Sequence, residues 1–236
     1  KQYYSGTEIG VSPAKTIRVL LRPYQPTVRF NGASAACGVG LAEGKTYSAR
    51  RKGDKVVLRN KKGRRLANCG KLLSATGGDS VGLVGKGAYR GALEIKPSSV
   101  PGRLNAVNAV DVESYLRGVV AEESPSSWPI EALKAQAVAA RSFALTTGVG
   151  GNGFDAYDDT RSQVYGGVGA ETARTDSAVA GTAGEVVQFN GKTIEAFFMS
   201  TSGGHTENVE NVFGGSAEPY LRGVPDPNEA AAGSPY

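Results

Sequence analysis

The segment from Asp111 to Leu145 limits the possible folds most, because it contains two helix patterns joined by a short loop. In the first pattern, 111–120, apolar residues recur at intervals of three and four, which places them on one face of an α-helix. Asp111 stands where an N-terminal cap is needed. The second pattern, 130–145, follows a proline that suits a first helical turn and is rich in alanine, which lets neighbouring backbone approach closely. We expect it to form a buried central helix.

Strand patterns surround these helices without the regular strand–helix alternation of a parallel sheet. Before the helices, alternating apolar residues and turn signals predict strands at 16–22, 27–30, 46–50, 55–59, 80–84, 89–96 and 104–110. After them we expect a helix near 174–180 and a hairpin formed by 185–190 and 193–199. The predicted fold class is therefore α+β, with mostly antiparallel strands around a buried central helix.

Residues 31–88 differ from the rest in being rich in both glycine and basic residues. The whole chain has 33 glycines in 236 residues, roughly twice the usual share of about 7%, which indicates many tight turns. We expect 31–88 to form a small basic β-subdomain inserted near the N-terminus. It would separate an N-terminal arm and the first strands, 1–30, from a main domain, 89–236. Within the first part, residues 1–14 are predicted to be a loose arm.

Charge is divided unevenly along the chain. Residues 1–103 hold 20 Lys or Arg against 5 Asp or Glu, whereas residues 104–236 hold 7 against 17. Such asymmetry suggests that the two halves have different partners, and the basic half could meet nucleic acid, a membrane surface or an acidic wall polymer. The basic cluster 61–65 fits either a solvated turn or a polyanion contact. Because no recognition helix or aromatic-basic motif is present, we expect no nucleic-acid partner.

Cys37 and Cys69 are the two cysteines of the chain. We expect them to form a disulfide, the alternative being two separate buried thiols. A disulfide implies an oxidising compartment, and a chain that begins at Lys1 without an initiator methionine fits a processed, secreted protein. No apolar stretch approaches 18 residues, so no membrane span is expected. Two cysteines and one histidine, His205, are too few for a structural zinc site, and we expect no metal.

Glu122 and Glu123 stand between the two helix patterns, just before Ser124 and Pro125. Adjacent side chains point in different directions, so one of the two carboxyl groups can turn inward against the apolar helix end. A carboxyl group next to apolar surface holds its proton near neutral pH and can protonate a leaving-group oxygen. The simpler alternative is a pair of solvated glutamates.

The run from Asp111 to Ser142 resembles the signature of the stage II sporulation protein D family, also called the amidase-enhancer domain (SpoIID/LytB) family. The opening strands at 17–21 and 89–91 are similar as well. Shorter similar segments follow the signature at Ser162–Gly166, Gly184–Val187, Ser200–Gly204, Thr206–Asn208 and Tyr220–Asp226. Residues 31–88 resemble nothing in the family.

This resemblance implies a secreted, cell-wall-associated lytic transglycosylase that acts on peptidoglycan, with glycan strands freed of stem peptides as the expected substrate. The family's catalytic glutamate stands in a Glu-Met-Pro context, which corresponds here to Glu123-Ser124-Pro125. Glu123 would protonate the oxygen between MurNAc and GlcNAc. As a carboxylate it would then deprotonate the MurNAc 6-hydroxyl, which closes a 1,6-anhydro ring. One carboxyl group suffices, whereas ordinary glycosidases use two.

Polar residues in two later segments are expected to contact the sugar, although each has a structural alternative. Gln163 and Tyr165 fit packing residues as well, Ser200–Gly204 fits a structural turn, and His205 fits a donor that orients a neighbour. Trp128 is predicted to be a core anchor rather than a sugar platform. The expected substrate-binding residues are Gln163, Tyr165, Ser200, Ser202, Gly203, His205 and Asn208.

Some family members bind zinc through His and Cys residues after the central helix. Such residues are missing at these positions, so the resemblance implies no metal and no other cofactor here. The family's older name leaves a second function open, namely a non-catalytic wall-binding modulator that stimulates an amidase. Its partners would then be that amidase or anionic wall polymers.

Overall fold

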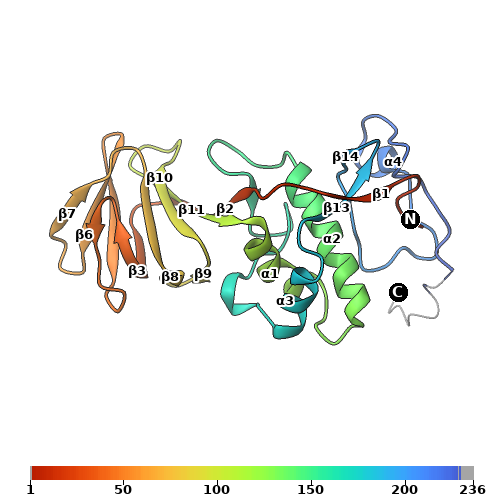
Figure 1. Cartoon of the computed structure of the whole chain (residues 1–236). Coiled ribbons are helices and arrows are strands. Elements are labelled where there is room, and N and C mark those ends of the chain that lie inside the picture. The colour runs from red at the N-terminus through yellow and green to blue at the C-terminus, as the bar shows by residue number, and fades with distance from the viewer. Residues whose placement is uncertain (1, 228, 230–236) are drawn as a thin grey trace.

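The computed structural model describes residues 2–227 and 229. The molecule is elongated, with a lobe made of strands at one end, helices in the middle and, at the other end, a smaller part that includes described residues from near both ends of the chain (Figure 1). We call the first of these parts the β lobe. It is built from residues 26–103.

One large sheet forms the β lobe and continues into the centre of the molecule. Within the described residues it has eleven strands, of which β12 pairs with β2 in parallel and the others pair antiparallel. Its strands are β2 (Thr16–Gln25), β3 (Val28–Ala36), β4 (Val39–Gly40), β5 (Tyr47–Lys52), β6 (Lys55–Asn60), β7 (Arg65–Asn68), β8 (Leu73–Leu83), β9 (Gly87–Tyr89), β10 (Ala92–Pro97), β11 (Leu104–Asp111) and β12 (Ala156–Tyr157). The strand order is β12-β2-β11-β10-β8-β3-β5-β6-β7, with β4 beside β3 and β9 beside β8.

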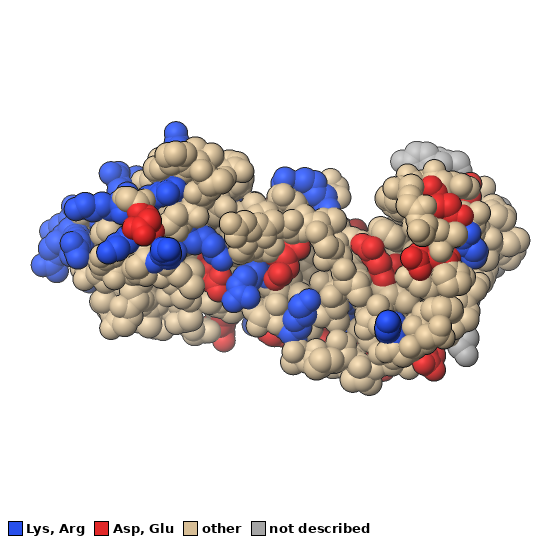
Figure 2. Space-filling view, turned by 90° about the horizontal axis from the view of Figure 1, so that it is seen from above, with Lys and Arg blue, Asp and Glu red and all other residues tan. Residues whose placement is uncertain are grey.

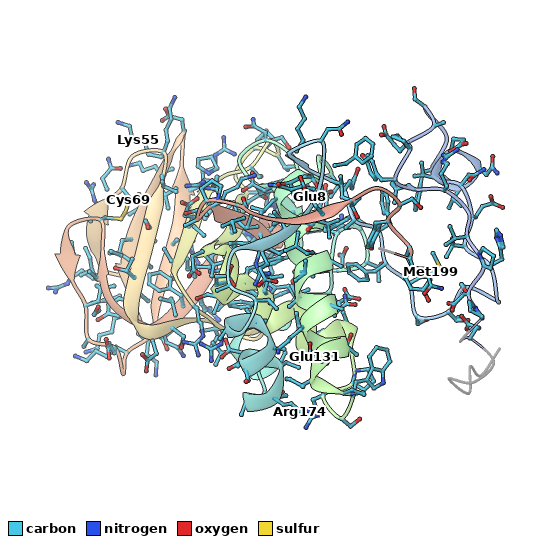
Figure 3. All side chains as sticks on the ribbon, turned by 45° about the vertical axis from the view of Figure 1, so that its right-hand side comes forward. Glu8, Lys55, Cys69, Glu131, Arg174 and Met199 are labelled. Atoms are coloured by element: carbon cyan, nitrogen blue, oxygen red, sulfur yellow. A yellow bond between two sulfur atoms is a disulfide. The ribbon has the colours of Figure 1, made fainter. Side chains whose placement is uncertain are left out.

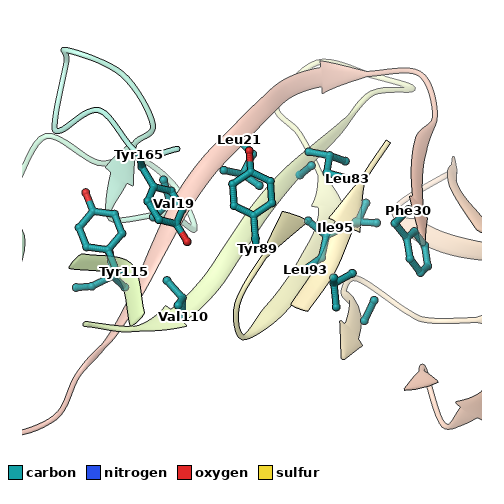
Figure 4. Packing of buried hydrophobic residues seen from close by; sticks show 14 of the residues in the cluster. Val19, Leu21, Phe30, Leu83, Tyr89, Leu93, Ile95, Val110, Tyr115 and Tyr165 are labelled. Atoms are coloured by element: carbon teal, nitrogen blue, oxygen red, sulfur yellow. The ribbon is translucent and has the colours of Figure 1, made fainter. Parts of the chain in front are cut away.

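The sheet curls on itself, so that β6 packs against β10 and β8 across a shared core. Strand residues alternate between the two faces of a sheet, and the inward residues here are apolar and buried. Figure 4 shows that this core is continuous, from Phe30 in the β lobe through Leu93 and Tyr89 to Tyr115 in the first helix. The β lobe and the helices are therefore built on one hydrophobic core.

A disulfide joins Cys37, in the turn after β3, to Cys69, just after β7. This confirms the expected pairing. In the loop-entropy model, closing a loop of this size stabilises the folded chain by about 3–4 kcal/mol. The bond therefore fixes the outer strands of the lobe, which lie farthest from the helices.

The helices are α1 (Val112–Glu123), α2 (Ile130–Thr146), α3 (Ala173–Ala180) and the short α4 (Val209–Phe213). Asp111 caps α1 as expected, since its side chain accepts a hydrogen bond from the Ser114 N–H at 3.0 Å. The helix runs three residues beyond the predicted Val120. It ends at Glu123 because the next residue, Ser124, precedes a proline and is held in an extended conformation.

Helix α2 lies in the middle of the molecule (Figure 1), and its residues 137–144 are all buried. Arg141 is fully buried there and forms two hydrogen bonds with the Glu113 carboxylate, at 2.8 and 2.7 Å. The paired charge makes its burial tolerable. Within the described part of the chain, no helix has the length and apolar character that a membrane crossing requires.

A second, three-stranded sheet contains β1 (Glu8–Val11), β13 (Glu185–Phe189) and β14 (Lys192–Thr193). The expectation of a loose arm is therefore wrong for Glu8–Val11, which pairs antiparallel with β13. The predicted hairpin turns at Asn190 and Gly191, but its second strand ends at Thr193 instead of Met199. The chain beyond Thr193 leaves the ladder because Ile194 and Ala196 pack against Val138 and Ala139 of α2.

The structure agrees with the predicted α+β class and with mainly antiparallel pairing. The boundaries between parts of the chain that the sequence suggested do not coincide with the ends of strands. The boundary at 30/31 falls inside β3, the boundary at 88/89 falls inside β9, and β8 pairs with β10. A single sheet thus crosses both boundaries. The irregular ending expected for 220–236 falls partly on residue 228 and residues 230–236, which lie outside the described residues.

Candidate active site

Glu123 is the last residue of α1, and its side chain is half-buried. Its Oε1 atom accepts a hydrogen bond of 2.9 Å from the backbone N–H of Val164, which lies in the loop after β12. Among the described residues, no group donates to Oε2 and no cation forms an ion pair with Glu123. One of the two carboxylate oxygens of Glu123 is therefore fixed by the loop.

Gly118 allows the loop that holds Val164 to lie close to α1. The Gly166 N–H donates to the Gly118 carbonyl at 3.1 Å. A Cβ atom at position 118 would lie 2.6 Å from the ring of Tyr165, which is much closer than such atoms come in proteins. A glycine is thus required one helical turn before the glutamates, because only its missing side chain leaves room for this contact.

A buried hydrogen-bond chain fixes Gln163, the residue before Val164. The Tyr115 hydroxyl donates to Gln163 Oε1 at 3.2 Å, and Gln163 Nε2 donates to the Ala140 carbonyl of α2 at 3.3 Å. Burial raises the pKa of Tyr115, so the hydroxyl remains a neutral donor. This chain connects α1, the loop and α2 directly beneath Glu123.

A second buried chain fixes Tyr165, the residue after Val164. Its hydroxyl donates to Asn108 Oδ1 at 2.8 Å, and the Asn108 amide donates in turn to the carbonyls of Arg90 and Ala92. Burial, followed by the nearby hydroxyls of Tyr89 and Tyr115, raises the pKa of Tyr165. Val164 is therefore held between two anchored neighbours, and the direction of its N–H is set by the core.

Of the two interpretations of Gln163 and Tyr165, these contacts favour a packing role. The two side chains are 2% and 4% exposed, and their polar atoms bond to protein atoms. They act as packing and positioning residues beneath the site.

Ion pairs hold the same loop against the β lobe. Arg90 forms two hydrogen bonds of 2.7 Å with the Glu171 carboxylate, Arg117 of α1 contacts the same carboxylate at 3.0 Å, and Lys86 pairs with Asp158. The loop that positions Glu123 thus depends on both parts of the molecule. Nothing in the local sequence signalled these pairs, because their partners are far apart in the chain.

The loop between α1 and α2 carries an exposed tryptophan. Trp128 is 42% exposed, so the expectation of a core anchor is wrong. The backbone holds the loop instead, since the Trp128 carbonyl accepts a hydrogen bond of 2.9 Å from Arg174 of α3. An exposed indole therefore follows Glu123 by five residues.

Ser124 directly follows Glu123 in the chain and is buried. Its hydroxyl has no hydrogen-bond partner among the described residues. Glu122 is exposed and its Oε1 lies beside Gly166. Of the two adjacent carboxyl groups, Glu123 is thus the one that the fold orients.

The other expected sugar-binding residues belong to a different part of the molecule. The Ser202 hydroxyl donates to the Asp226 carboxylate at 3.0 Å and the Ser202 N–H donates to the Glu229 carboxylate at 2.8 Å, while Asn208 Oδ1 accepts from the Gly223 N–H at 2.8 Å. His205 pairs with Pro225 through the backbone. This loop, which also includes Ser200 and Gly203, follows Met199, which lies on the far side of α2 from the β lobe (Figure 3). The structure therefore does not bring these five residues next to Glu123.

A mostly apolar cavity of about 420 Å³ lies beside that loop. Its walls include Tyr4, Phe197, Met199, Ser202, Val209 and Phe213. Glu123 does not line it. Sequence reasoning missed this cavity, although the apolar run 196–199 was a signal for it.

No group of three or more His, Cys, Asp or Glu side chains that could hold a metal ion occurs within the described residues. Within the described residues, the site around Glu123 therefore consists of its carboxyl group, the backbone N–H of Val164 and the buried side chains that hold the loop in place.

Comparison with known proteins adds an independent finding. Residues 101–189 match the model of the family described as stage II sporulation protein (SpoIID). The chain is 40% identical over 164 residues to stage II sporulation protein D of Bacillus subtilis, a match that covers 60% of the chain and 48% of that protein. It is 41% identical over 118 residues to the amidase enhancer of the same organism, covering 50% and 16% of the two chains.

An uncharacterized protein of Brachyspira hyodysenteriae is 42% identical over 121 residues, which cover 50% of the chain and 33% of that protein. The matched segments span less than half the length of each of these relatives. The family match includes Glu123, Val164 and all of α1, α2 and α3, but it leaves out nearly the whole β lobe.

Proposed function

We propose that this chain, which resembles the stage II sporulation protein D and amidase-enhancer family, is a peptidoglycan lytic transglycosylase with Glu123 as its single general acid and base. The observation that carries the proposal is the arrangement at Glu123. One carboxylate oxygen is fixed by the Val164 N–H, and the other has no partner among the described residues. The resemblance to the family supports a role at the cell wall.

In the first step, protonated Glu123 donates its proton through Oε2 to the glycosidic oxygen between MurNAc and GlcNAc. The bond from MurNAc C1 to that oxygen breaks, and GlcNAc leaves with the proton. Positive charge develops at C1, and the carboxylate that remains lies close enough to stabilise it.

In the second step, the same carboxylate removes the proton from the MurNAc 6-hydroxyl. The hydroxyl oxygen bonds to C1, which closes the 1,6-anhydro ring and restores protonated Glu123. Water is not consumed, so no second carboxyl group is needed to activate it. The Val164 N–H keeps Oε1 in place through both steps, so that the reacting oxygen stays aligned.

Trp128 provides a surface for the glycan in this proposal. Its exposed indole presents an apolar face of the kind on which sugar rings stack. Ser200, Ser202, Gly203, His205 and Asn208 are not included, because their contacts hold them in the part of the molecule that contains α4. The substrate is a glycan strand without stem peptides, and the enzyme works outside the cell at the wall.

The test is digestion of peptide-free glycan strands, with mass spectrometry of the products. The adjacent glutamates provide a matched pair of variants, since Glu123→Gln and Glu122→Gln remove the same charge at neighbouring positions. We expect 1,6-anhydroMurNAc ends from the unchanged protein and from Glu122→Gln, and none from Glu123→Gln. Equal product from Glu123→Gln would refute the role of Glu123, and the absence of product from the unchanged protein would refute the enzyme.

A second candidate is a non-catalytic modulator that stimulates an amidase. It is favoured by the 41% identity to a protein named amidase enhancer. In that case Glu123→Gln would stimulate the release of stem peptides by a wall amidase as well as the unchanged protein does. Loss of stimulation in Glu123→Gln would count against this candidate.

A further inference from the structure

Three arginines form a row across neighbouring strands on the outer face of the β lobe. Arg29 of β3 lies opposite Ser48 of β5, Ser48 lies opposite Arg59 of β6, and Arg59 lies opposite Arg65 of β7. The residues on either side of Arg29, Val28 and Phe30, are buried. Since successive side chains point to opposite faces, the row faces outward. We call Arg29, Arg59 and Arg65 the arginine row.

More basic residues flank the arginine row on the same strands. Arg50 is two residues beyond Ser48 and is exposed, and Lys52 lies directly opposite Lys55. The turn between β6 and β7 adds the exposed residues Lys61, Lys62 and Arg64. In all, residues 44–78 contain 11 Lys or Arg and a single acidic residue, Asp54. Figure 2 shows the resulting concentration of basic side chains at this end of the molecule.

These charges lack counter-ions within the protein. Arg90, Arg117, Arg141 and Arg222 each pair with a carboxylate, but no member of the arginine row forms an ion pair with a described residue. Arg59 donates one hydrogen bond to the Gly63 carbonyl, while its Nε is buried without a partner in the described structure. Like charges directly opposite each other on paired strands, as in Arg59–Arg65 and Lys52–Lys55, destabilise a sheet. An external anion would relieve this repulsion.

The arrangement indicates the shape and chemistry of that anion. The cations extend over four strands, which are about 4.8 Å apart, so one small ion cannot reach them all. The arginine fork donates bidentate hydrogen bonds to phosphate groups, and a linear polymer with one such group in each repeat can meet arginines on successive strands. Repeated phosphate groups along a linear chain therefore match the arginine row.

Nucleic acid fits this surface less well. Proteins that bind single strands stack the bases on exposed aromatic side chains. Between residues 26 and 103 the aromatic residues are Phe30, Tyr47 and Tyr89, and all three are buried. The disulfide between Cys37 and Cys69 also indicates an oxidising compartment, which intracellular nucleic acid does not share.

We propose that the outer face of β3, β5, β6 and β7 binds a linear, base-free polymer of phosphodiester-linked polyols through the arginine row and Arg50. The surface belongs to the β lobe, outside the segment that matches the family model. It would hold the protein on such a polymer whether or not Glu123 cleaves glycan.

The test measures the affinity of the full chain for poly(glycerol phosphate) of defined length, by fluorescence anisotropy. The exposed residues Arg29, Arg50 and Arg65 are changed together to Gln, which spares the half-buried Arg59. The matched control changes Lys15, Arg161 and Lys192 to Gln, removing three exposed positive charges outside the β lobe. Thermal unfolding of both variants checks that the fold is kept.

We expect the unchanged protein to bind, and its affinity to fall steeply with salt because counter-ions are released. The Arg29/Arg50/Arg65 variant should bind at least about tenfold more weakly at low salt, while the control should change by less than about threefold. An equal loss in both variants would show that net charge alone acts and would overturn the proposal. Two further probes of equal charge, polygalacturonate and single-stranded DNA, should bind more weakly. If either binds as tightly as poly(glycerol phosphate), the phosphodiester-polyol assignment is wrong.

Discussion

Val164 donates its backbone N–H to Oε1 of Glu123 across 2.9 Å, although the two residues are 41 positions apart in the chain. Helix α1 positions the Glu123 carboxyl group, and the hydrogen bond from the loop sets its orientation. The chemistry proposed for Glu123 therefore depends on how firmly residues 163–165 are held.

Gly118→Ala should disturb the loop without touching Glu123. The added methyl group would overlap the Tyr165 ring, and relieving the overlap moves the loop away from α1. We expect a loss of about 1–3 kcal/mol in the free energy of unfolding, measured by urea denaturation, and a lower kcat on glycan strands. Gly169→Ala is the matched control, since a Cβ there meets no atom within 4 Å. Equal effects of the two variants would contradict the steric argument.

Gln163→Leu should destabilise the protein by leaving the buried Tyr115 hydroxyl without its acceptor. The expected loss is about 1–3 kcal/mol. Combining it with Tyr115→Phe, which removes the orphaned hydroxyl, should cost less than the sum of the two single changes. Strict additivity in this double-mutant cycle would mean that the two side chains do not interact.

Glu94 is a buried residue of β10, and it should make the free energy of unfolding depend on pH in the acid range. Burial alone would raise the pKa of this carboxyl group, but hydrogen bonds from Arg18 and Lys96 outweigh it and hold the pKa below its ordinary value of 4.5. The stabilisation is thus complete above pH 4.5 and is lost as the pH falls through the lower, folded-state pKa. Glu94→Gln should show a smaller drop in unfolding free energy between pH 5 and pH 3. A drop as large as that of the unchanged protein would rule out this contribution.

Trp128→Ala should affect substrate binding more than stability. The indole is 42% exposed, so we expect the free energy of unfolding to change by no more than about 0.5 kcal/mol. KM for glycan strands should rise, while Trp128→Tyr, which keeps a flat aromatic face, should retain most of the affinity. If KM is unchanged in Trp128→Ala, the indole is not part of the glycan surface.

Local signals in the sequence were sufficient for much of the fold. The spacing of apolar residues predicted α1, a proline followed by an alanine-rich run predicted α2, and Asp111 was correctly expected to cap the first helix. The two lone cysteines led to the correct disulfide. These features depend on neighbouring residues or on a simple count, and so they can be read without the tertiary structure.

Features that depend on distant partners were not predictable in this way. Glu8–Val11 forms a strand only because β13, about 175 residues later in the chain, supplies its ladder. Trp128 is 42% exposed, and the backbone of its loop is held by Arg174, which lies 46 residues later in the chain. The Val164 N–H has no signature at all in the sequence, since every residue except proline carries that donor.

The most direct measurement of the central claim is cleavage of glycan strands in water labelled with oxygen-18. A reaction in which Glu123 protonates the glycosidic oxygen and then closes the 1,6-anhydro ring takes no oxygen from water. Mass spectrometry should therefore find MurNAc ends that lack the label and are lighter by one water than a hydrolysed end. Products that carry oxygen-18 at the new MurNAc end would identify a hydrolase and would contradict the mechanism assigned to Glu123.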